Sequence, residues 1–283
     1  MIHTIAVAGA GTMGGGIAQT FAQAGHDVLL YDESAAAIDR ARRAVEKSLA
    51  KFVEKGEMSD DDRDAALACV RPAATVGQLV TGDFFIEAIV ESENAKRALL
   101  KSVDTLLRPT VILASNTSSI AISTLAAATG RPDRVVGMHF MNPVPLMPLV
   151  EIVRGSATSD ETVATTMMLC QELGKTPVES ADRPGFIANR VLMPMINEAV
   201  HALAEGVASA ESIDTVMKLG MRHPMGPLAL ADLIGLDVCV AIMEVMAAGL
   251  GDRKYAPAAL LREKVAAGEL GRKSGKGFYE YQN

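Results

Sequence analysis

The stretch that decides the fold runs from Ile2 to Asp32 and reads IHTIAVAGAGTMGGGIAQTFAQAGHDVLLYD. The apolar run over residues 2–8 is typical of a strand covered on both faces. Apolar residues at helical spacing follow over 12–24, and Gly25 stands where a left-handed helix terminator belongs. A second strand is expected over 28–32. Strand, glycine turn, helix and strand form a βαβ unit, which predicts a parallel sheet.

The turn inside this unit has the form G-x-G-x-x-G and is followed by an acidic residue, Asp32, at the end of the next strand. The residues of the turn are Gly9, Ala10, Gly11, Thr12, Met13 and Gly14. The first glycine permits a tight turn, the second lets a pyrophosphate approach the backbone, and the third lets helix and sheet pack closely. A carboxylate at Asp32 accepts hydrogen bonds from a ribose and repels a 2′-phosphate. The turn therefore predicts a site for NAD in preference to NADP, and the alternative is a glycine turn without a ligand.

Composition narrows the class of protein further. The chain has 283 residues, of which 49% are hydrophobic and 22% charged, so a packed globular protein is expected rather than a disordered one. Its net charge of −7 gives no expectation of nucleic-acid or membrane binding. The three cysteines, Cys69, Cys170 and Cys239, are few and far apart, which predicts buried free thiols, no metal site and a cytoplasmic location.

The first part of the chain predicts an α/β domain over residues 1–183. Further apolar strand-like runs occur at 84–90, 111–115, 135–139 and 149–153, which indicates an open, doubly wound sheet of Rossmann type. Between the second strand and these runs, Ser34 to Lys55 carries apolar residues at steps of three and four, and Ser59 is placed to cap a second helix. We expect a helical hairpin over about 34–70.

After Pro184-Gly185 helical periodicity replaces the strand-like runs. Helices are expected over 187–205, 209–219 and 228–246, with a shorter one from Pro257. Residues 184–283 therefore form a predicted all-helical C-terminal domain.

One histidine of the five lies where ligands of open α/β sheets usually bind. His139 ends an apolar strand late in the predicted sheet, and Glu151 is a lone carboxylate in the next apolar run. A buried carboxylate needs a partner. If the intervening turn folds the two strands together, Glu151 can hold the ring of His139 in one tautomer and make it a general base. The alternative is a purely structural pair.

Two polar groups accompany this pair. Residues 116–119 follow the strand at 111–115 and offer hydroxyl and amide groups to a reacting oxygen, or alternatively cap a helix. In the hairpin, Ser48, Lys51 and Lys55 share one helix face. Such a lysine face can bind an anionic handle such as the phosphates of coenzyme A, and a solvated helix face is the alternative.

Taken together, the motifs closely resemble those of the L-3-hydroxyacyl-CoA dehydrogenases, and within that family the short-chain, bacterial-type 3-hydroxybutyryl-CoA dehydrogenases. The resemblance extends over essentially the whole chain. It is carried by Gly9-Ala-Gly11-Thr-Met-Gly14, Ser115-Asn-Thr-Ser118-Ser119, His139-Phe-Met-Asn142-Pro143, Pro184-Gly-Phe-Ile-Ala-Asn189-Arg190, His223-Pro-Met-Gly-Pro227 and Gly271-Arg-Lys273-Ser-Gly-Lys-Gly277-Phe-Tyr279.

The resemblance implies an activity, the reversible NAD-dependent oxidation of (3S)-3-hydroxyacyl-CoA to 3-oxoacyl-CoA. It implies a homodimer formed through the helical domain and a substrate cleft at that domain. The implied catalytic residues are His139 as base, Glu151 as its partner, and Ser118 and Asn189 as substrate contacts. The implied cofactor contacts, besides the glycine turn, are Asp32, Glu91, Lys96, Asn142 and Lys273, and the implied coenzyme A contacts are Ser48 and Lys55.

The chain departs from the usual pattern of the family at two positions. Pro148 stands where many relatives carry a lysine, and Ser92 replaces a more usual asparagine. Two alternative functions also stay open from the sequence. One is a related dehydrogenase of a free hydroxy acid or sugar acid, and the other is a non-catalytic, crystallin-like nucleotide-binding protein.

Overall fold

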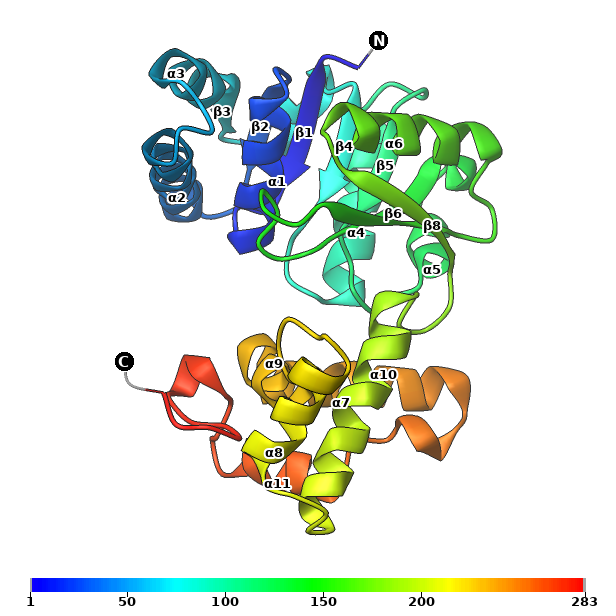
Figure 1. Cartoon of the computed structure of the whole chain (residues 1–283). Helices are drawn as coiled ribbons and strands as arrows, with labels where there is room; N and C mark the ends of the chain where they lie inside the picture. Colours follow the sequence, from blue (N-terminus) through cyan, green and yellow to red (C-terminus); the bar gives the residue numbers. More distant parts are fainter. Residues whose placement is uncertain (1, 282–283) are drawn as a thin grey trace. The chain divides into compact units, whose positions relative to one another are not determined.

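A computed structural model describes residues 2–281, which form two compact units that divide between Arg183 and Pro184. The first unit is built on a single sheet, in which the described strands have the order β3-β2-β1-β4-β5-β6-β7-β8 (Figure 1). Its strands are β1 (Thr4–Ala8), β2 (Asp27–Tyr31), β3 (Val70–Ala73), β4 (Phe84–Glu87), β5 (Ile112–Ser115), β6 (Val135–Phe140), β7 (Leu149–Arg154) and β8 (Thr176–Ala181).

The direction of the strands determines where a site can form. Strands β1 to β6 pair in parallel, whereas β7 runs antiparallel to β6. The carboxyl ends of β1, β4, β5 and β6 therefore meet at one edge of the sheet, the usual place for a ligand in an open α/β fold. The prediction of a Rossmann-type sheet is confirmed.

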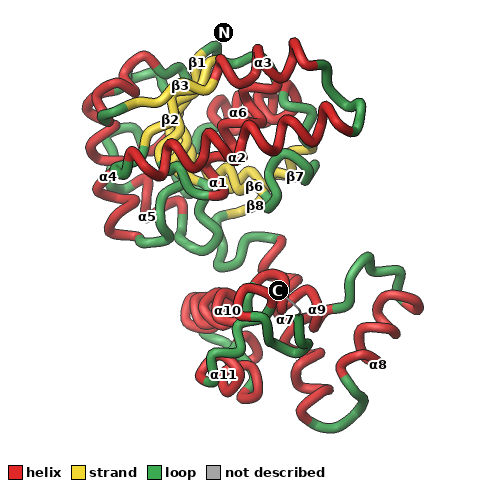
Figure 2. The backbone as a smooth tube through the Cα atoms, turned by 90° about the vertical axis from the view of Figure 1, so that its left-hand side faces the viewer, coloured by secondary structure: helices red, strands yellow, loops and turns green. Residues whose placement is uncertain are grey.

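Helices cover both faces of this sheet. They are α1 (Thr12–Gln23), α2 (Ala35–Glu54), α3 (Asp60–Cys69), α4 (Glu93–Leu106), α5 (Ile122–Ala126) and α6 (Asp160–Glu172). The expected hairpin is the connection from β2 to β3, in which α2 and α3 pack on each other and on α1 (Figure 2). Ser34 and Ser59 cap its two helices, because each side chain accepts a hydrogen bond from a backbone N–H three residues on.

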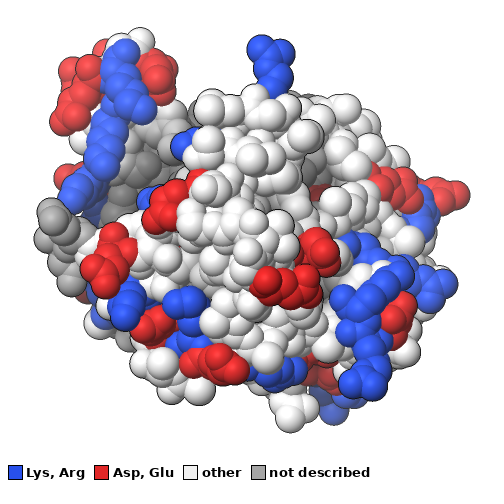
Figure 3. All heavy atoms as spheres, turned by 60° about the horizontal axis from the view of Figure 1, so that its bottom comes forward, with Lys and Arg blue, Asp and Glu red and all other residues white. Residues whose placement is uncertain are grey.

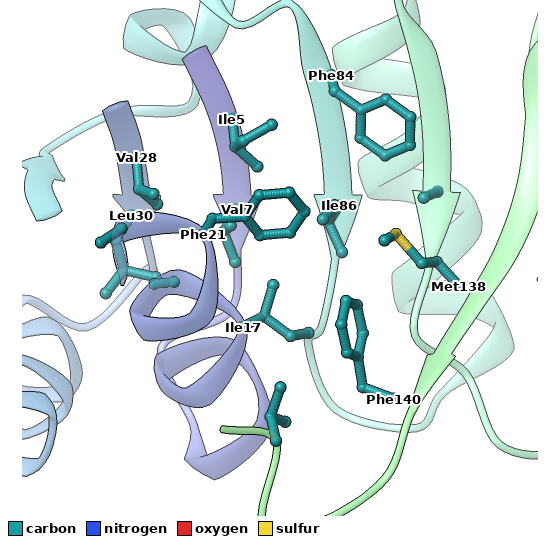
Figure 4. Close-up of a cluster of buried hydrophobic side chains, with 14 of the residues drawn as sticks. Ile5, Val7, Ile17, Phe21, Val28, Leu30, Phe84, Ile86, Met138 and Phe140 are labelled. Atoms are coloured by element: carbon teal, nitrogen blue, oxygen red, sulfur yellow. The ribbon is translucent and has the colours of Figure 1, made fainter. Parts of the chain in front are cut away.

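The core of the first unit lies between α1 and the middle of the sheet (Figure 4). Ile17 and Phe21 project from α1 onto β1 and β4, where Val7 and Ile86 are also fully buried. Burying a side chain of this size contributes about 1.5–3 kcal/mol to stability. This packing holds the start of α1, and with it the glycine turn, against the sheet.

The second unit is helical. Its helices are α7 (Ala188–Ala204), α8 (Ala210–Thr215), α9 (Pro227–Ile234), α10 (Leu236–Leu250) and α11 (Ala259–Ala266). The prediction of one helix over 228–246 is wrong, because Gly235 divides it into α9 and α10 with φ of +105°, a backbone conformation that other residues rarely adopt. The expected helix over 209–219 is regular only as far as Thr215, and a π turn follows over Val216–Gly220.

Several further expectations about local structure need correction. Strands β3 and β8 were not predicted, because β3 contains Pro72 and β8 exposes most of its residues, as sheet edges allow. The strand expected over 84–90 ends at Glu87. Residues 116–119 do not cap α5, which begins at Ile122. The backbone N–H groups of Ile122 and Ser123 at its start donate instead to the carboxylate of Asp182.

The cysteines behave differently from one another. Cys170 and Cys239 are buried as predicted, and burial raises the pKa of each thiol to about 12. The prediction that Cys69 is buried is wrong, because it ends α3 and is partly exposed.

On the face shown in Figure 3, basic side chains form small groups among acidic ones. No single helix within residues 2–281 is long and apolar enough to cross a membrane, although the pair α9 and α10, bent by 96°, passes the length and composition test together.

Candidate active site

A cavity of about 950 Å³ opens at the carboxyl edge of the sheet in the first unit. Gly9, Ala10, Gly11 and Thr12 line it, whereas Met13 and Gly14 do not. Gly9 has φ of +103°, and a Cβ there would lie 2.4 Å from the carbonyl oxygen of Ala88. A Cβ at Gly11 would meet no atom within 4 Å, so this residue leaves open space above the turn. The turn therefore fits a dinucleotide pyrophosphate, which must come close to backbone N–H groups.

The predicted ribose-binding carboxylate also lines the cavity. Asp32 Oδ2 accepts a hydrogen bond from Ala10 N at 2.8 Å, and Oδ1 accepts one from Ser34 N at 2.9 Å. These two backbone donors hold the carboxylate beside the glycine turn. A carboxylate at the cavity wall suits a free ribose hydroxyl better than a phosphate.

The strand pairing brings the predicted base and its partner together. His139 on β6 is registered directly opposite Glu151 on the antiparallel β7. The Nδ1 atom of His139 lies 2.8 Å from Oε2 of Glu151, and both side chains are buried. An ionised carboxylate can only accept, so Nδ1 is the donor in this contact, and in the neutral ring Nε2 then carries the lone pair.

The Nε2 atom of His139 faces the hydroxyl group of Ser118. Ser118 Oγ lies 3.0 Å from His139 Nε2, so three of the predicted catalytic side chains, Glu151, His139 and Ser118, form one hydrogen-bonded chain. A base whose far nitrogen is held by a carboxylate is the arrangement that proton abstraction from a substrate hydroxyl requires.

The loop that carries Ser118 is held by Glu91. Glu91 Oε1 accepts hydrogen bonds from the hydroxyl of Thr117 at 2.6 Å and the backbone N–H groups of Ser118 and Ser119 at 3.0 and 3.1 Å. Burial acts to raise the pKa of Glu91, but Lys96 and these donors outweigh it and hold the pKa below its usual value. Glu91 is thus an anchor for the loop in this structure and is not among the cavity-lining residues.

A buried ion pair beneath this loop was missed by the sequence analysis. Lys96 Nζ lies 2.6 Å from Glu87 Oε1 and 3.2 Å from Glu91 Oε2, and its side chain is only 1% exposed. Glu87 also accepts from the Ser115 hydroxyl at 2.6 Å. Burial raises the pKa of Glu87, and Lys96 and Ser115 oppose that effect. The only sequence signal for this pair was a second glutamate four residues before Glu91.

Helix α2 forms one wall of the cavity. Ser48 lines it, as does Arg40 two turns earlier, which the sequence analysis did not select. Lys51 lies further along α2, and Lys55 is the residue that follows its end. Both are exposed, and neither has a carboxylate partner within 4 Å among residues 2–281. Ser48, Lys51 and Lys55 therefore occupy two successive turns on one face of α2, of which only Ser48 lines the cavity.

The remaining predicted residues divide between the two units. Asn142 lines the cavity in the first unit. In the helical unit, Asn189 lies in the first turn of α7, and Lys273 Nζ pairs with Asp237 Oδ2 at 2.7 Å. Within residues 2–281, no three His, Cys, Asp or Glu side chains gather closely enough to hold a metal ion.

Comparison with known proteins identifies the family to which this fold and site correspond. Residues 4–183 match the family model for the NAD-binding domain of 3-hydroxyacyl-CoA dehydrogenase, and residues 185–281 match the model for its C-terminal domain. A Bacillus subtilis protein named probable 3-hydroxybutyryl-CoA dehydrogenase is 53% identical over 281 residues, which cover 99% of this chain and 98% of that protein. A Clostridioides difficile 3-hydroxybutyryl-CoA dehydrogenase is 49% identical, with coverage of 98% and 99%.

A solved structure gives the same result. The crystal structure of (S)-3-hydroxybutyryl-CoA dehydrogenase PaaH1 from Ralstonia eutropha matches with a TM-score of 0.97 and 49% identity, over 100% of both chains. These comparisons and the dinucleotide cavity define an NAD-binding oxidoreductase. The chain belongs to the 3-hydroxyacyl-CoA dehydrogenase family, and the family predicted from the sequence is confirmed.

Proposed function

We propose that this enzyme catalyses the reversible NAD-dependent oxidation of (3S)-3-hydroxybutyryl-CoA to acetoacetyl-CoA. The observation that carries the proposal is the chain of contacts from Glu151 through His139 to Ser118, which lies at the same sheet edge as the dinucleotide cavity. The substrate is taken from the names of the full-length relatives.

In this proposal His139 is the general base. Its Nε2 lone pair takes the proton of the C3 hydroxyl, a role for which a positioned base contributes about 100- to 10,000-fold in rate. Glu151 keeps the hydrogen of Nδ1 in place and stabilises the imidazolium that forms. The Ser118 hydroxyl is 3.0 Å from Nε2, a position from which it can hydrogen-bond the same C3 oxygen. Bound NAD supplies the hydride acceptor.

The same proposal assigns the binding residues. The glycine turn and Asp32 hold the pyrophosphate and the adenosine ribose, and Asn142 adds a cofactor contact. Ser48, Lys51 and Lys55 on α2 receive the phosphates of coenzyme A. The family resemblance adds Asn189 as a substrate contact, and Glu91, Lys96 and Lys273 as residues of the cofactor site. We further propose a homodimer formed through the helical unit and a cytoplasmic location, which the small number of cysteines favours.

The direct test is the oxidation of NADH with acetoacetyl-CoA, followed at the nicotinamide absorbance band. We expect turnover with the thioester and not with free acetoacetate, and a preference for NADH over NADPH. Turnover with free acetoacetate at the same efficiency would favour the alternative of a hydroxy-acid dehydrogenase. Binding of NADH without turnover of any hydroxyacyl or oxoacyl substrate would favour the non-catalytic alternative.

A further inference from the structure

One wall of the cavity is a loop whose own backbone hydrogen bonds are too few to hold it in place. This wall is the loop of residues 142–148, Asn-Pro-Val-Pro-Leu-Met-Pro, which follows β6 and is called the proline loop below. Its residues Asn142, Pro143, Val144 and Pro145 line the cavity. Three of its seven residues are prolines, which have no N–H group to donate. The loop is therefore poor in backbone donors and cannot satisfy all of its own carbonyl groups.

Side-chain packing secures only part of the proline loop. Val144 is buried against α1, where a Cβ at Gly16 would come within 2.9 Å of Val144 Cβ. Beyond it, Leu146 is 58% exposed and Met147 is 37% exposed. Leu146 N and Met147 N both donate to the carbonyl of Pro143. These contacts leave the carbonyls of three other loop residues to be satisfied from elsewhere.

Lys175 supplies those hydrogen bonds. Its Nζ donates to the carbonyl oxygens of Val144 and Met147 at 2.8 Å each and to that of Pro145 at 3.3 Å. An ammonium group has three donors, and all three are used. The residue is buried, and no carboxylate lies within 4 Å of its ammonium among residues 2–281. Burial lowers the pKa of Lys175, as expected for a cation compensated by carbonyl dipoles alone.

The turn between α6 and β8 places Lys175 beside the proline loop. Helix α6 ends just before Gly174, whose φ of +69° turns the chain toward β8. Thr176 N then donates to the carbonyl of Pro148 at 2.7 Å. The start of edge strand β8 and one buried ammonium thus hold the proline loop, and neither Lys175 nor Thr176 is itself among the residues that line the cavity.

We propose that Lys175 is a positioning residue for the nucleotide site, which clamps the proline loop as a wall of the cavity and thereby sets the affinity for NAD(H). This inference rests on the assignment of the cavity to NAD. The clamp acts on the wall and not on proton transfer, because the contact between His139 and Glu151 is held by the pairing of β6 with β7. Loss of the clamp therefore weakens nucleotide binding more than it slows the chemical step.

The test compares Lys175→Met with a matched variant, Arg131→Met. Arg131 is also a largely buried cation that donates to backbone carbonyls, including those of Asp104 and Leu107, but no residue of the segment 104–111 lines the cavity. Both variants remove a cation that holds a loop of the first unit. Only Lys175→Met removes one that holds the cavity wall.

Two measurements are made on the full chain. The first is the dissociation constant for NADH, which we expect to rise about tenfold in Lys175→Met, equivalent to about 1.4 kcal/mol. In Arg131→Met it should stay within about twofold, and kcat of Lys175→Met at saturation should fall by no more than about threefold. The second is hydrogen exchange of the Leu146 and Met147 amides, which should quicken about tenfold only in Lys175→Met.

Three results would contradict the proposed role of Lys175. Equal weakening of NADH binding in both variants, or unchanged exchange at Leu146 and Met147, would overturn the proposal. A fall in kcat with an unchanged dissociation constant would also overturn it. Lys175→Arg keeps the charge and several donors and should restore most of the affinity. If Lys175→Met does not fold, Lys175→Gln, which also lacks the ammonium group, takes its place with the same expected loss of NADH affinity. If the wild-type chain binds no NADH, the exchange experiment still tests the clamp itself.

Discussion

At the scale of single residues, the proposed chemistry depends on one histidine, His139, whose two ring nitrogens have different partners. Glu151 engages Nδ1 and Ser118 lies next to Nε2. His139 and Glu151 are buried and Ser118 is partly buried, and each side chain is oriented by the strand or loop that carries it. Such a pair sets the tautomer of the ring as well as its position.

Replacement of His139 by Ala should lower kcat by about 100- to 10,000-fold, because the proton of the C3 hydroxyl then has no positioned acceptor. NADH binding should be nearly unchanged, since His139 is not among the residues that line the dinucleotide cavity. Glu151→Gln should cause a smaller loss, since the ring remains but its imidazolium form is no longer stabilised. Steady-state rates and an NADH titration measure both effects. Wild-type rates in His139→Ala would show that another group is the base.

Asp32 should determine the choice between NAD and NADP. In Asp32→Ala the carboxylate that we assign to the adenosine ribose is absent, and the repulsion that it would exert on a 2′-phosphate is absent with it. We expect the ratio of kcat/KM for NADH to that for NADPH to fall at least about tenfold, which corresponds to about 1.4 kcal/mol. Exposed Asp39 on α2 is not a cavity-lining residue, so Asp39→Ala serves as the control. An unchanged ratio in Asp32→Ala would contradict the assignment.

At the scale of elements, the loop after β5 is positioned by a carboxylate that belongs to another segment. Glu91 accepts hydrogen bonds from four donors in residues 117–119 and is itself paired with the buried Lys96. Hydrogen bonds to a charged group are each worth about 1.5–3 kcal/mol. The position of the Ser118 hydroxyl therefore depends on the segment that follows β4.

Glu91→Gln should disturb this loop, because the neutral amide accepts more weakly and leaves Lys96 with Glu87 as its only carboxylate partner in the described chain. We expect the KM for acetoacetyl-CoA to rise about tenfold, a loss of about 1.4 kcal/mol at the Ser118 contact. The control is Glu93→Gln, which removes an exposed charge that pairs with Arg97 on the surface of α4. If both variants behave alike, Glu91 does not position the loop.

The lysines of α2 should act on the phosphates of the substrate. Reversal of charge in the double variant Lys51→Glu, Lys55→Glu should raise the KM for acetoacetyl-CoA about tenfold or more at low salt, and less as salt screens the charges. A truncated acetoacetyl thioester without the nucleotide should be used equally by variant and wild type. The double variant Arg97→Glu, Lys101→Glu, at two exposed positions on α4, makes the same change of −4 in net charge and serves as the control. An equal loss with both thioesters would exclude phosphate recognition by this helix.

At the scale of the whole molecule, the helical unit presents apolar side chains to solvent. Val191, Val207, Val216 and Leu219 are each more than half exposed. Apolar side chains exposed on one unit favour the proposed homodimer, in which a partner subunit would cover some of them. We expect sedimentation equilibrium at micromolar concentration to give twice the 29.8 kDa mass of the chain. A single species of 29.8 kDa under these conditions would contradict the proposed homodimer.

Much of the fold and site could be predicted from the sequence because the deciding signals are local. The glycine turn, the strand before it and Asp32 lie within one βαβ unit, and their spacing alone defines the geometry. The caps at Ser34 and Ser59 are likewise fixed within three residues. His139 and Glu151 could be paired because a short connection between neighbouring apolar runs places them on adjacent strands.

Other features were decided by the tertiary structure alone. Strands β3 and β8 lack the apolar run that predicts a strand. They lie at the edges of the sheet, where many of their side chains are exposed. Gly235 breaks a helix whose apolar pattern continues across it. The buried pair of Glu87 with Lys96, and the three carbonyls bound by Lys175, join groups from separate segments. Local spacing determines turns, caps and neighbouring strands, whereas the partner of a buried charge depends on which distant segments the completed sheet brings together.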